Sequence, residues 1–240
     1  AGLGGGINSY IFLSSGGDYV ISRSLRFKSA DSSRLSRTFS AGNRKTFTLS
    51  FWIKRSGLTS NTGHAILYAG TAGSTTNRTA LLIGNAGFSG SGNSILFGQD
   101  TSGSWTTYRE TSALFRDHSA WAHIVLAVDS TQATASDRIK IYVNGVLQTS
   151  FATSNDPSED HEFFINNNNA HYLGEDVGDF VGNLDAYLAD IHFVNGQASS
   201  PTDFGEFDDD EVWQPKKFSG SYGTTGFHLD FKDNSSIAAL

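Results

Sequence analysis

The chain has 240 residues, a net charge of -7 and no cysteine, which excludes disulfides, thiolate metal sites and a cysteine nucleophile. The acidic balance and the lack of a Lys/Arg cluster argue against nucleic-acid binding, and no apolar run has the length of a membrane span. Charged residues make up 17% of the chain, against about 25% in an average soluble domain. This polar but weakly charged surface suits an extracellular or virion location.

The first 22 residues predict an N-terminal arm. Glycine-rich pieces surround a short apolar patch that contains Ile11, Phe12 and Leu13, and such a segment has little reason to fold alone. Two interpretations stay open, a flexible linker and a docking arm that becomes ordered against a partner chain. The apolar patch favours docking, because its side chains would otherwise be exposed to water.

From residue 24 onward, short strand-like runs alternate with turn clusters, and no segment has a sustained helical period. The predicted strands are residues 24–27, 47–53, 65–68, 80–83, 94–97, 124–128, 139–143, 163–165, 187–194 and 227–231. The three prolines lie outside these runs, as expected because proline cannot donate to a β-ladder. The pattern predicts an all-β sandwich, formed as a single domain by residues 23–240.

The clearest pairing signal lies between residues 121 and 148. In residues 124–128 and in residues 139–143, every second side chain is Ile, Leu or Val, and this period of two is typical of half-buried strands. Asn144 and Gly145 follow the second run, and both residue types accept the positive φ angles of a tight hairpin turn. The sequence therefore predicts paired antiparallel strands in the middle of the chain.

The order of these segments resembles a known superfamily. Residues 47–54, 121–129, 139–145 and 184–193 follow one another as the strands of laminin-G-like, concanavalin-A-like domains do. The resemblance spans about residues 24–200 and implies an antiparallel jelly-roll β-sandwich. It is specific for the fold and says little about activity.

A narrower resemblance concerns the segments SLRFKSADSSRLSRTFSAGNRKTFTLSFWIKRS, HFVNGQASSPTDFGEF and VWQPKKFSGSYGTTGFHLDF, with a trailing DNSS. They are similar to a group of tailed-bacteriophage virion proteins. The resemblance implies a non-enzymatic protein of the tail fibre, tail appendage or capsid exterior, at the surface of the phage particle. Its partners would be copies of itself in a closed homo-oligomer, other virion proteins and host-surface glycans. A purely architectural decoration protein and a glycan depolymerase are the alternatives.

Two groups of residues are candidates for glycan binding, because aromatic rings beside hydroxyl and amide groups suit sugars. Trp105 and Tyr108 lie in one segment, and Asn167 and Tyr172 in another. Packing in the core stays open as the alternative for Trp105.

No motif requires a cofactor, but one loop is a candidate calcium site. Glu175, Asp176 and Asp179 cluster in a short glycine-containing loop, and calcium prefers several oxygen ligands. A solvated turn is the alternative interpretation.

No catalytic residue is assigned, because the carboxylates lack the spacing that glycoside hydrolysis requires. The nearest approach is the Glu-Asp-His-Glu run at residues 159–162, which lies in a loop without an aromatic platform. Asp185 and Asp190 are five residues apart, so on a strand they point to opposite faces, and Asp190 is expected to bond a neighbouring loop. His123 is expected to be structural, since the histidines lack metal-ligand spacing. The chain is therefore predicted not to be an enzyme.

Overall fold

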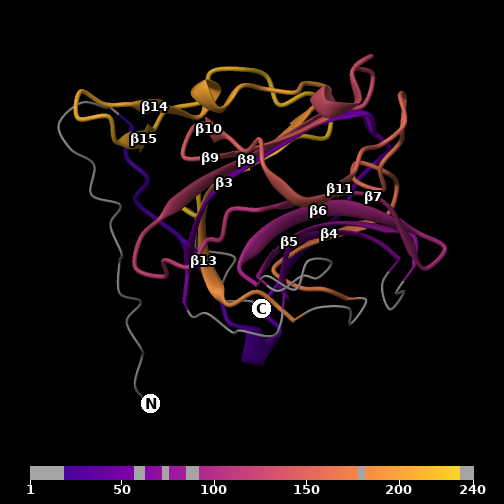
Figure 1. The fold of residues 1–240 in the computed structure, drawn as a ribbon. Helices are drawn as coiled ribbons and strands as arrows, with labels where there is room; N and C mark the ends of the chain where they lie inside the picture. Colours follow the sequence, from indigo (N-terminus) through magenta and orange to yellow (C-terminus); the bar gives the residue numbers. More distant parts are fainter. Residues whose placement is uncertain (1–18, 57–62, 72–75, 85–91, 178–181, 233–240) are drawn as a thin grey trace.

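Alternating apolar side chains place the strands in two antiparallel sheets, which pack face to face in the computed structural model (Figure 1). The structure describes residues 19–56, 63–71, 76–84, 92–177 and 182–232. These residues form an antiparallel β-sandwich, so the predicted fold class is confirmed. Within the described ranges, no helix combines the length and apolarity that a membrane crossing requires.

The two sheets have seven strands each in the described part of the chain. Sheet A has the order β1-β13-β3-β8-β9-β10, and β16 also pairs with β13. Its strands are β1 (Leu25–Phe27), β3 (Thr46–Arg55), β8 (Ala122–Asp129), β9 (Ile139–Val143), β10 (Val146–Leu147), β13 (Ala186–Asn195) and β16 (Phe227–Leu229).

Sheet B has the order β11-β7-β6-β5-β4-β12-β2. Its strands are β2 (Leu35–Thr38), β4 (Gly63–Gly70), β5 (Arg78–Gly84), β6 (Ser94–Thr101), β7 (Ser104–Thr111), β11 (Phe151–Asn155) and β12 (Ala170–Leu173). A separate hairpin joins β14 (Gly205–Phe207) to β15 (Trp213–Pro215). The 3-10 helices are η1 (Ser29–Asp31), η2 (Ala135–Asp137) and η3 (Pro201–Asp203).

The core lies between the two sheets and is filled by the side chains on the inner face of each strand. In β3, Phe47, Leu49 and Phe51 are at most 1% exposed. Phe97 of sheet B meets Phe47 edge-on, with ring centroids 6.5 Å apart. Burying each such side chain contributes about 1.5–3 kcal/mol, so this apolar layer holds the two sheets together.

The predicted central pairing is confirmed. β8 and β9 pair antiparallel, with Ile124 opposite Val143 and Leu126 opposite Ile141. After β9, Asn144 and Gly145 have φ angles of 48° and 78°, as a type I′ turn requires. The chain then returns as β10 beside β9.

The prediction of a strand at residues 163–165 is wrong. Phe163 and Ile165 are fully buried, but the backbone amides of Phe163 and Phe164 donate to the Arg44 carbonyl and the Thr79 hydroxyl. The segment is a buried loop, because its hydrogen bonds go to another loop and to a side chain, not to a strand ladder. A short apolar run alone does not distinguish these cases.

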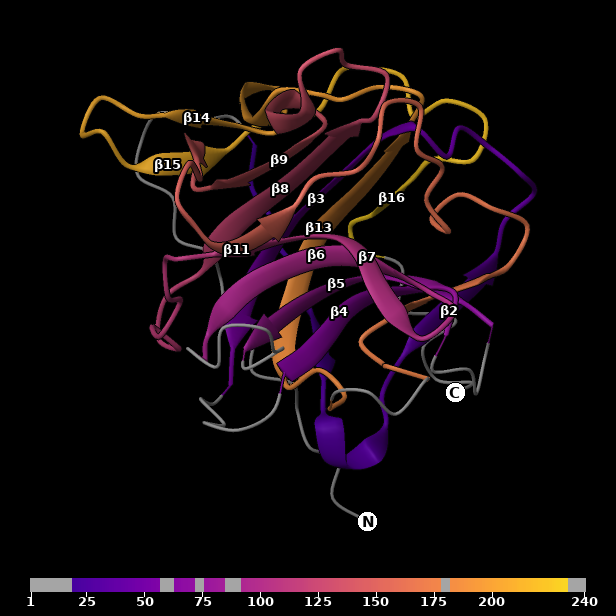
Figure 2. The same ribbon diagram turned by 45° about the vertical axis from the view of Figure 1, so that its right-hand side comes forward.

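Segments that follow β13 pack on the outer face of sheet A, and Figure 2 shows the β14–β15 hairpin at the upper left, to the side of β9. Ile21, at the end of the predicted arm, is 5% exposed and packs with Trp52 on this face. The docking residues Ile11, Phe12 and Leu13 lie outside the described residues. Docking by the arm therefore stays a prediction.

Candidate functional site

The outer face of sheet B carries three of the predicted glycan-binding residues. A small apolar cluster lies on the side of sheet B away from the core, and it consists of Ala65, Ala80, Leu82 and Leu96 from β4, β5 and β6. Trp105 from β7 packs against this cluster. Trp105 is therefore partly buried, but it lies outside the core between the sheets.

Trp105 and Tyr108 lie side by side over Gly98. Tyr108 pairs with Gly98 across the β6–β7 ladder, and a register shift brings Trp105 opposite Asp100. A Cβ added at Gly98 would lie 2.8 Å from the Tyr108 Cβ and 3.0 Å from the Trp105 Cε3. The glycine thus gives both rings room on one face, where both stay partly exposed.

Two charged residues, Arg78 and Asp100, lie next to Trp105. The Arg78 guanidinium lies 5.6 Å from the centroid of the Trp105 ring, at a distance where cation and ring attract each other. The Asp100 Oδ1 accepts from the backbone amides of Asn77 and Gly103, at 3.2 and 3.0 Å. These hydrogen bonds fix the β6–β7 turn immediately before Trp105.

Tyr172 lies on the same face of sheet B as Trp105 but near the opposite edge of the sheet. β12 is four strands away from β7, which is about 19 Å at the usual strand spacing. Tyr172 is 9% exposed and contacts Tyr68 edge-on, with ring centroids 6.1 Å apart. Burial raises the pKa of Tyr68 to about 12. Tyr172 and Trp105 are thus too far apart to contact one sugar ring.

The other predicted ligands lie in loops beside β12. Asn167 precedes β12, and its side-chain oxygen accepts from the Asn168 amide at 2.9 Å. Glu175 forms an ion pair of 2.5 Å with Arg34, and Asp176 is 4% exposed. Asp179 lies outside the described residues, so calcium binding by this loop stays a prediction.

The carboxylates at residues 159–162 each point to a different basic side chain. The three ion pairs are Glu159–Arg138 at 3.7 Å, Asp160–Lys45 at 3.1 Å and Glu162–Arg44 at 2.7 Å. They therefore do not converge on one point, as an acid and a nucleophile of glycoside hydrolysis must.

His123 has a structural role, and its hydrogen bonds fix its tautomer. Its Nδ1 accepts from the Trp213 indole at 3.0 Å, so the proton lies on Nε2, which donates to the Ser50 hydroxyl at 2.8 Å. A nitrogen that donates to Ser50 cannot remove its proton, so the pair is not a nucleophile with its base. Burial lowers the pKa of His123 to about 3, which keeps the ring neutral.

Family comparison adds to this geometry. A protein-family profile described as the concanavalin A-like lectin/glucanases superfamily matches residues 14–202. The chain belongs to this superfamily. The match covers both sheets up to η3, which includes Trp105 and Tyr108, whereas β14, β15 and β16 lie beyond it. No curated protein sequence matches the chain.

Some solved structures are similar to the chain at low sequence identity. The botulinum neurotoxin type C structure is 16% identical with a TM-score of 0.42, over 68% of this chain and 35% of that one. Domain 4 of the Geobacillus stearothermophilus arabinanase AbnA, in complex with arabinotriose, is 18% identical with a TM-score of 0.41, over 67% and 65%. The CBM40 domain of a Ruminococcus gnavus sialidase, bound to sialyllactose, is 16% identical with a TM-score of 0.42, over 75% and 96%. The chain thus spans less than two thirds of the first two structures.

Proposed function

We propose that this protein is a non-enzymatic, carbohydrate-binding adhesion module that serves on the surface of a phage virion. The observation that carries the binding role is the pair of partly exposed rings, Trp105 and Tyr108, on one face of β7. Such rings offer an apolar face and a polar tip, which match the C–H groups and hydroxyl groups of a sugar. The superfamily is named for lectins and glucanases, so glycan binding and glycan cleavage are the functions to separate.

The spacing of carboxylates on this face favours binding over cleavage. Glu110 pairs with Leu96, and Asp100 lies four residues farther along β6, which is about 13 Å along the strand. Glycoside hydrolysis uses carboxyl groups roughly 5–9.5 Å apart. Glu110 is also engaged, since the Ser94 hydroxyl donates to it at 2.7 Å.

The virion location rests on the resemblance of residues 24–56 and of the C-terminal segments to phage virion proteins. In this proposal the sandwich is displayed on a tail fibre, tail appendage or capsid exterior as a homo-oligomer. Its partners are other virion proteins, copies of itself and host-surface glycans. A purely architectural role is the second candidate, and the absence of any glycan ligand would favour it.

A glycan array that includes bacterial surface polysaccharides tests the binding role. We expect the 240-residue chain to bind a defined set of glycans, and Trp105→Ala to lose at least about tenfold in affinity, as is usual for a central aromatic contact. Tyr187→Ala is the matched control. Tyr187 is a partly exposed ring of sheet A that packs against Arg26, with the guanidinium 5.2 Å from its centroid.

Three results would contradict the proposal in different ways. Equal binding by the wild-type, Trp105→Ala and Tyr187→Ala proteins would show that the glycan-binding site is not on β7. The absence of any bound glycan would contradict the proposed role in adhesion. The release of reducing ends from a bound polysaccharide would show that the protein is an enzyme.

A further inference from the structure

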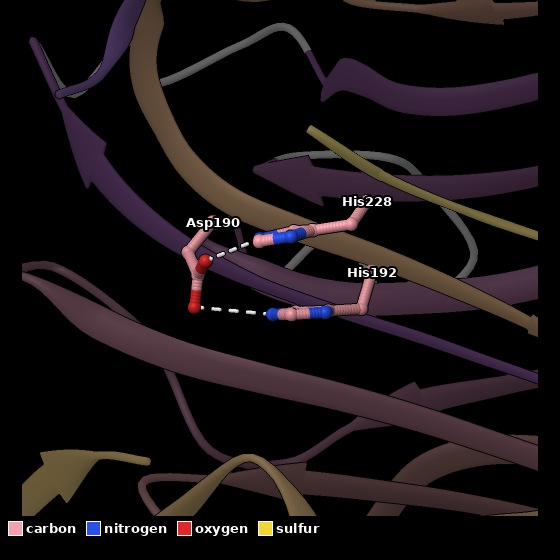
Figure 3. Close-up of side chains that lie close together, drawn as sticks. All are labelled: Asp190, His192 and His228. Carbon is pink, nitrogen blue, oxygen red and sulfur yellow. Dashed lines mark hydrogen bonds and ion pairs between the residues drawn. The ribbon is translucent and has the colours of Figure 1, made fainter. Parts of the chain in front are cut away.

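Asp190, His192 and His228 form a compact polar cluster on the outer face of sheet A (Figure 3). His192 in β13 lies directly opposite His228 in β16. Asp190 has a φ angle of 49°, at a register shift between β13 and β3, and such a bulge re-aims a side chain. The Asp190 carboxylate thereby faces both imidazole rings (Figure 3). The Tyr19 hydroxyl, in the loop before β1, also donates to this carboxylate, so the expectation that Asp190 bonds a neighbouring loop is confirmed.

The three side chains bring metal-ligand atoms together. The His228 Nε2 lies 2.7 Å from the Asp190 Oδ1, and the His192 Nε2 lies 3.1 Å from the Asp190 Oδ2. One ligand atom from each residue falls within 4.8 Å of the other two. The imidazole rings stack, with centroids 4.2 Å apart and planes 8° from parallel. Two imidazoles and one carboxylate are a ligand set that divalent transition metals use.

The charge of the cluster also favours a cation. The Asp190 side chain is 3% exposed, and among the described residues its ion-pair partners are the two imidazoles alone. A buried carboxylate is costly unless a positive charge or a metal compensates it. The Asp190 carboxylate is the acidic group of the cluster, and a bound cation would compensate its charge.

Two tyrosines supply the outer hydrogen bonds that metal sites normally have. The Tyr19 hydroxyl donates to the Asp190 Oδ1 at 2.7 Å, and the Tyr222 hydroxyl lies 2.8 Å from the His192 Nδ1. When a metal binds Nε2, the ring proton moves to Nδ1, and the Tyr222 oxygen is placed to accept it. The orientation of His192 is thus already set.

We propose that Asp190, His192 and His228 bind one divalent transition-metal ion of the zinc class, through the two Nε2 atoms and one carboxylate oxygen. Zinc bonds of 2.0–2.2 Å place tetrahedral ligand atoms about 3.3 Å apart, so the three ligand atoms, which lie within 4.8 Å of one another, must rearrange to that spacing as the ion binds. One ring must also rotate out of the parallel stack. His228 has room for this, since its side chain is 28% exposed.

The ion would act as a staple for the C-terminal strand. β16 pairs with β13 at three positions, and it contributes His228 to the cluster. A metal held by both strands links them by coordination in addition to the ladder. Water would occupy the remaining coordination position, as it does where three protein ligands bind zinc.

Calorimetric titration of the metal-free 240-residue chain with zinc tests the site, and the cobalt absorption spectrum reports nitrogen ligation. We expect one ion per chain and a rise in the melting temperature, because an ion that binds the folded state stabilises it. His228→Ala should weaken binding at least tenfold and abolish the rise. His118→Ala is the matched control, because His118 is exposed and lies outside the cluster.

The wild-type titration alone can overturn the proposal, if the chain binds no zinc saturably or binds it without a nitrogen signature in the cobalt spectrum. Unchanged zinc affinity in a folded His228→Ala protein would also overturn it. If His228→Ala does not fold, His228→Gln replaces it, with the same expected loss. Neither result depends on glycan binding, which concerns the opposite sheet.

Discussion

At the scale of single residues, glycines determine how closely other segments approach the strands. Gly145 has a φ angle of 78°, and a Cβ there would lie 2.4 Å from the Cζ3 of Trp213. Gly103 has a similar φ angle of 85°, but the nearest atom to its Cβ would be 3.5 Å away. An alanine at Gly103 would therefore meet backbone strain alone, whereas an alanine at Gly145 would meet both backbone strain and steric overlap.

Gly145→Ala should destabilise the fold more than Gly103→Ala. Both substitutions pay for an L-residue in the left-handed region, about 1–2 kcal/mol, but only Gly145→Ala adds overlap with Trp213, about 1–3 kcal/mol more. Urea unfolding followed by tryptophan fluorescence measures both variants. Equal losses would mean that Trp213 moves away at no cost.

At the scale of elements, strict alternation made the strands of sheet A predictable. β3, β8 and β9 each place every second side chain in the core, and their prediction is confirmed. β7 and β11 are rich in Thr and Ser and lack this pattern, and the edge strand β2 is only four residues long. These strands are stabilised by pairing with neighbouring strands, and the periodicity of their own sequence does not reveal that pairing.

The same reasoning explains the sites. Trp105 and Tyr108 could be selected by residue type, but their meeting depends on a register shift and on Gly98 in another strand. The Asp190 cluster could not be predicted, because the expectation assumed unbroken alternation along the strand. The bulge at Asp190 breaks it, and His228 comes from a strand far along the chain.

Arg109 links the two sheets, and its loss should be costly. This β7 side chain is 5% exposed and donates to Asp156 at 2.6 Å and to the carbonyl of Ile139 in β9. Arg109→Met removes the donor from the buried Ile139 carbonyl and the ion-pair partner from Asp156, whose side chain is 25% exposed, so we expect a loss of about 3 kcal/mol. Arg116→Met, at an exposed position, should stay within about 0.5 kcal/mol of wild type in the same denaturation assay. Similar losses for both would contradict the linking role of Arg109.

At the scale of the whole molecule, buried histidines make stability depend on pH. Burial lowers the pKa of His123 to about 3 and that of His171 to about 4, whereas both titrate near 6.5 in the unfolded chain. Between these values the unfolded chain binds protons that the folded protein does not, so stability falls as the pH decreases from about 6.5 toward 4. Hydrogen bonds from imidazole and tyrosine lower the pKa of Asp190. Carboxyl groups of this kind change the pH dependence of stability only below about pH 4.

This argument predicts a change in slope that one substitution can isolate. As the pH falls, each histidine that stays neutral in the folded protein lowers the free energy of unfolding by up to about 1.4 kcal/mol per pH unit. His123→Gln should therefore flatten the dependence between pH 6 and pH 4.5 by about that amount, even though it also lowers stability by disturbing the bonds to Ser50 and Trp213. His118→Gln, at an exposed position, should leave the slope unchanged. Urea denaturation of metal-free protein at several pH values measures the slopes, and an unchanged slope in His123→Gln would mean that this ring takes up a proton inside the folded sandwich.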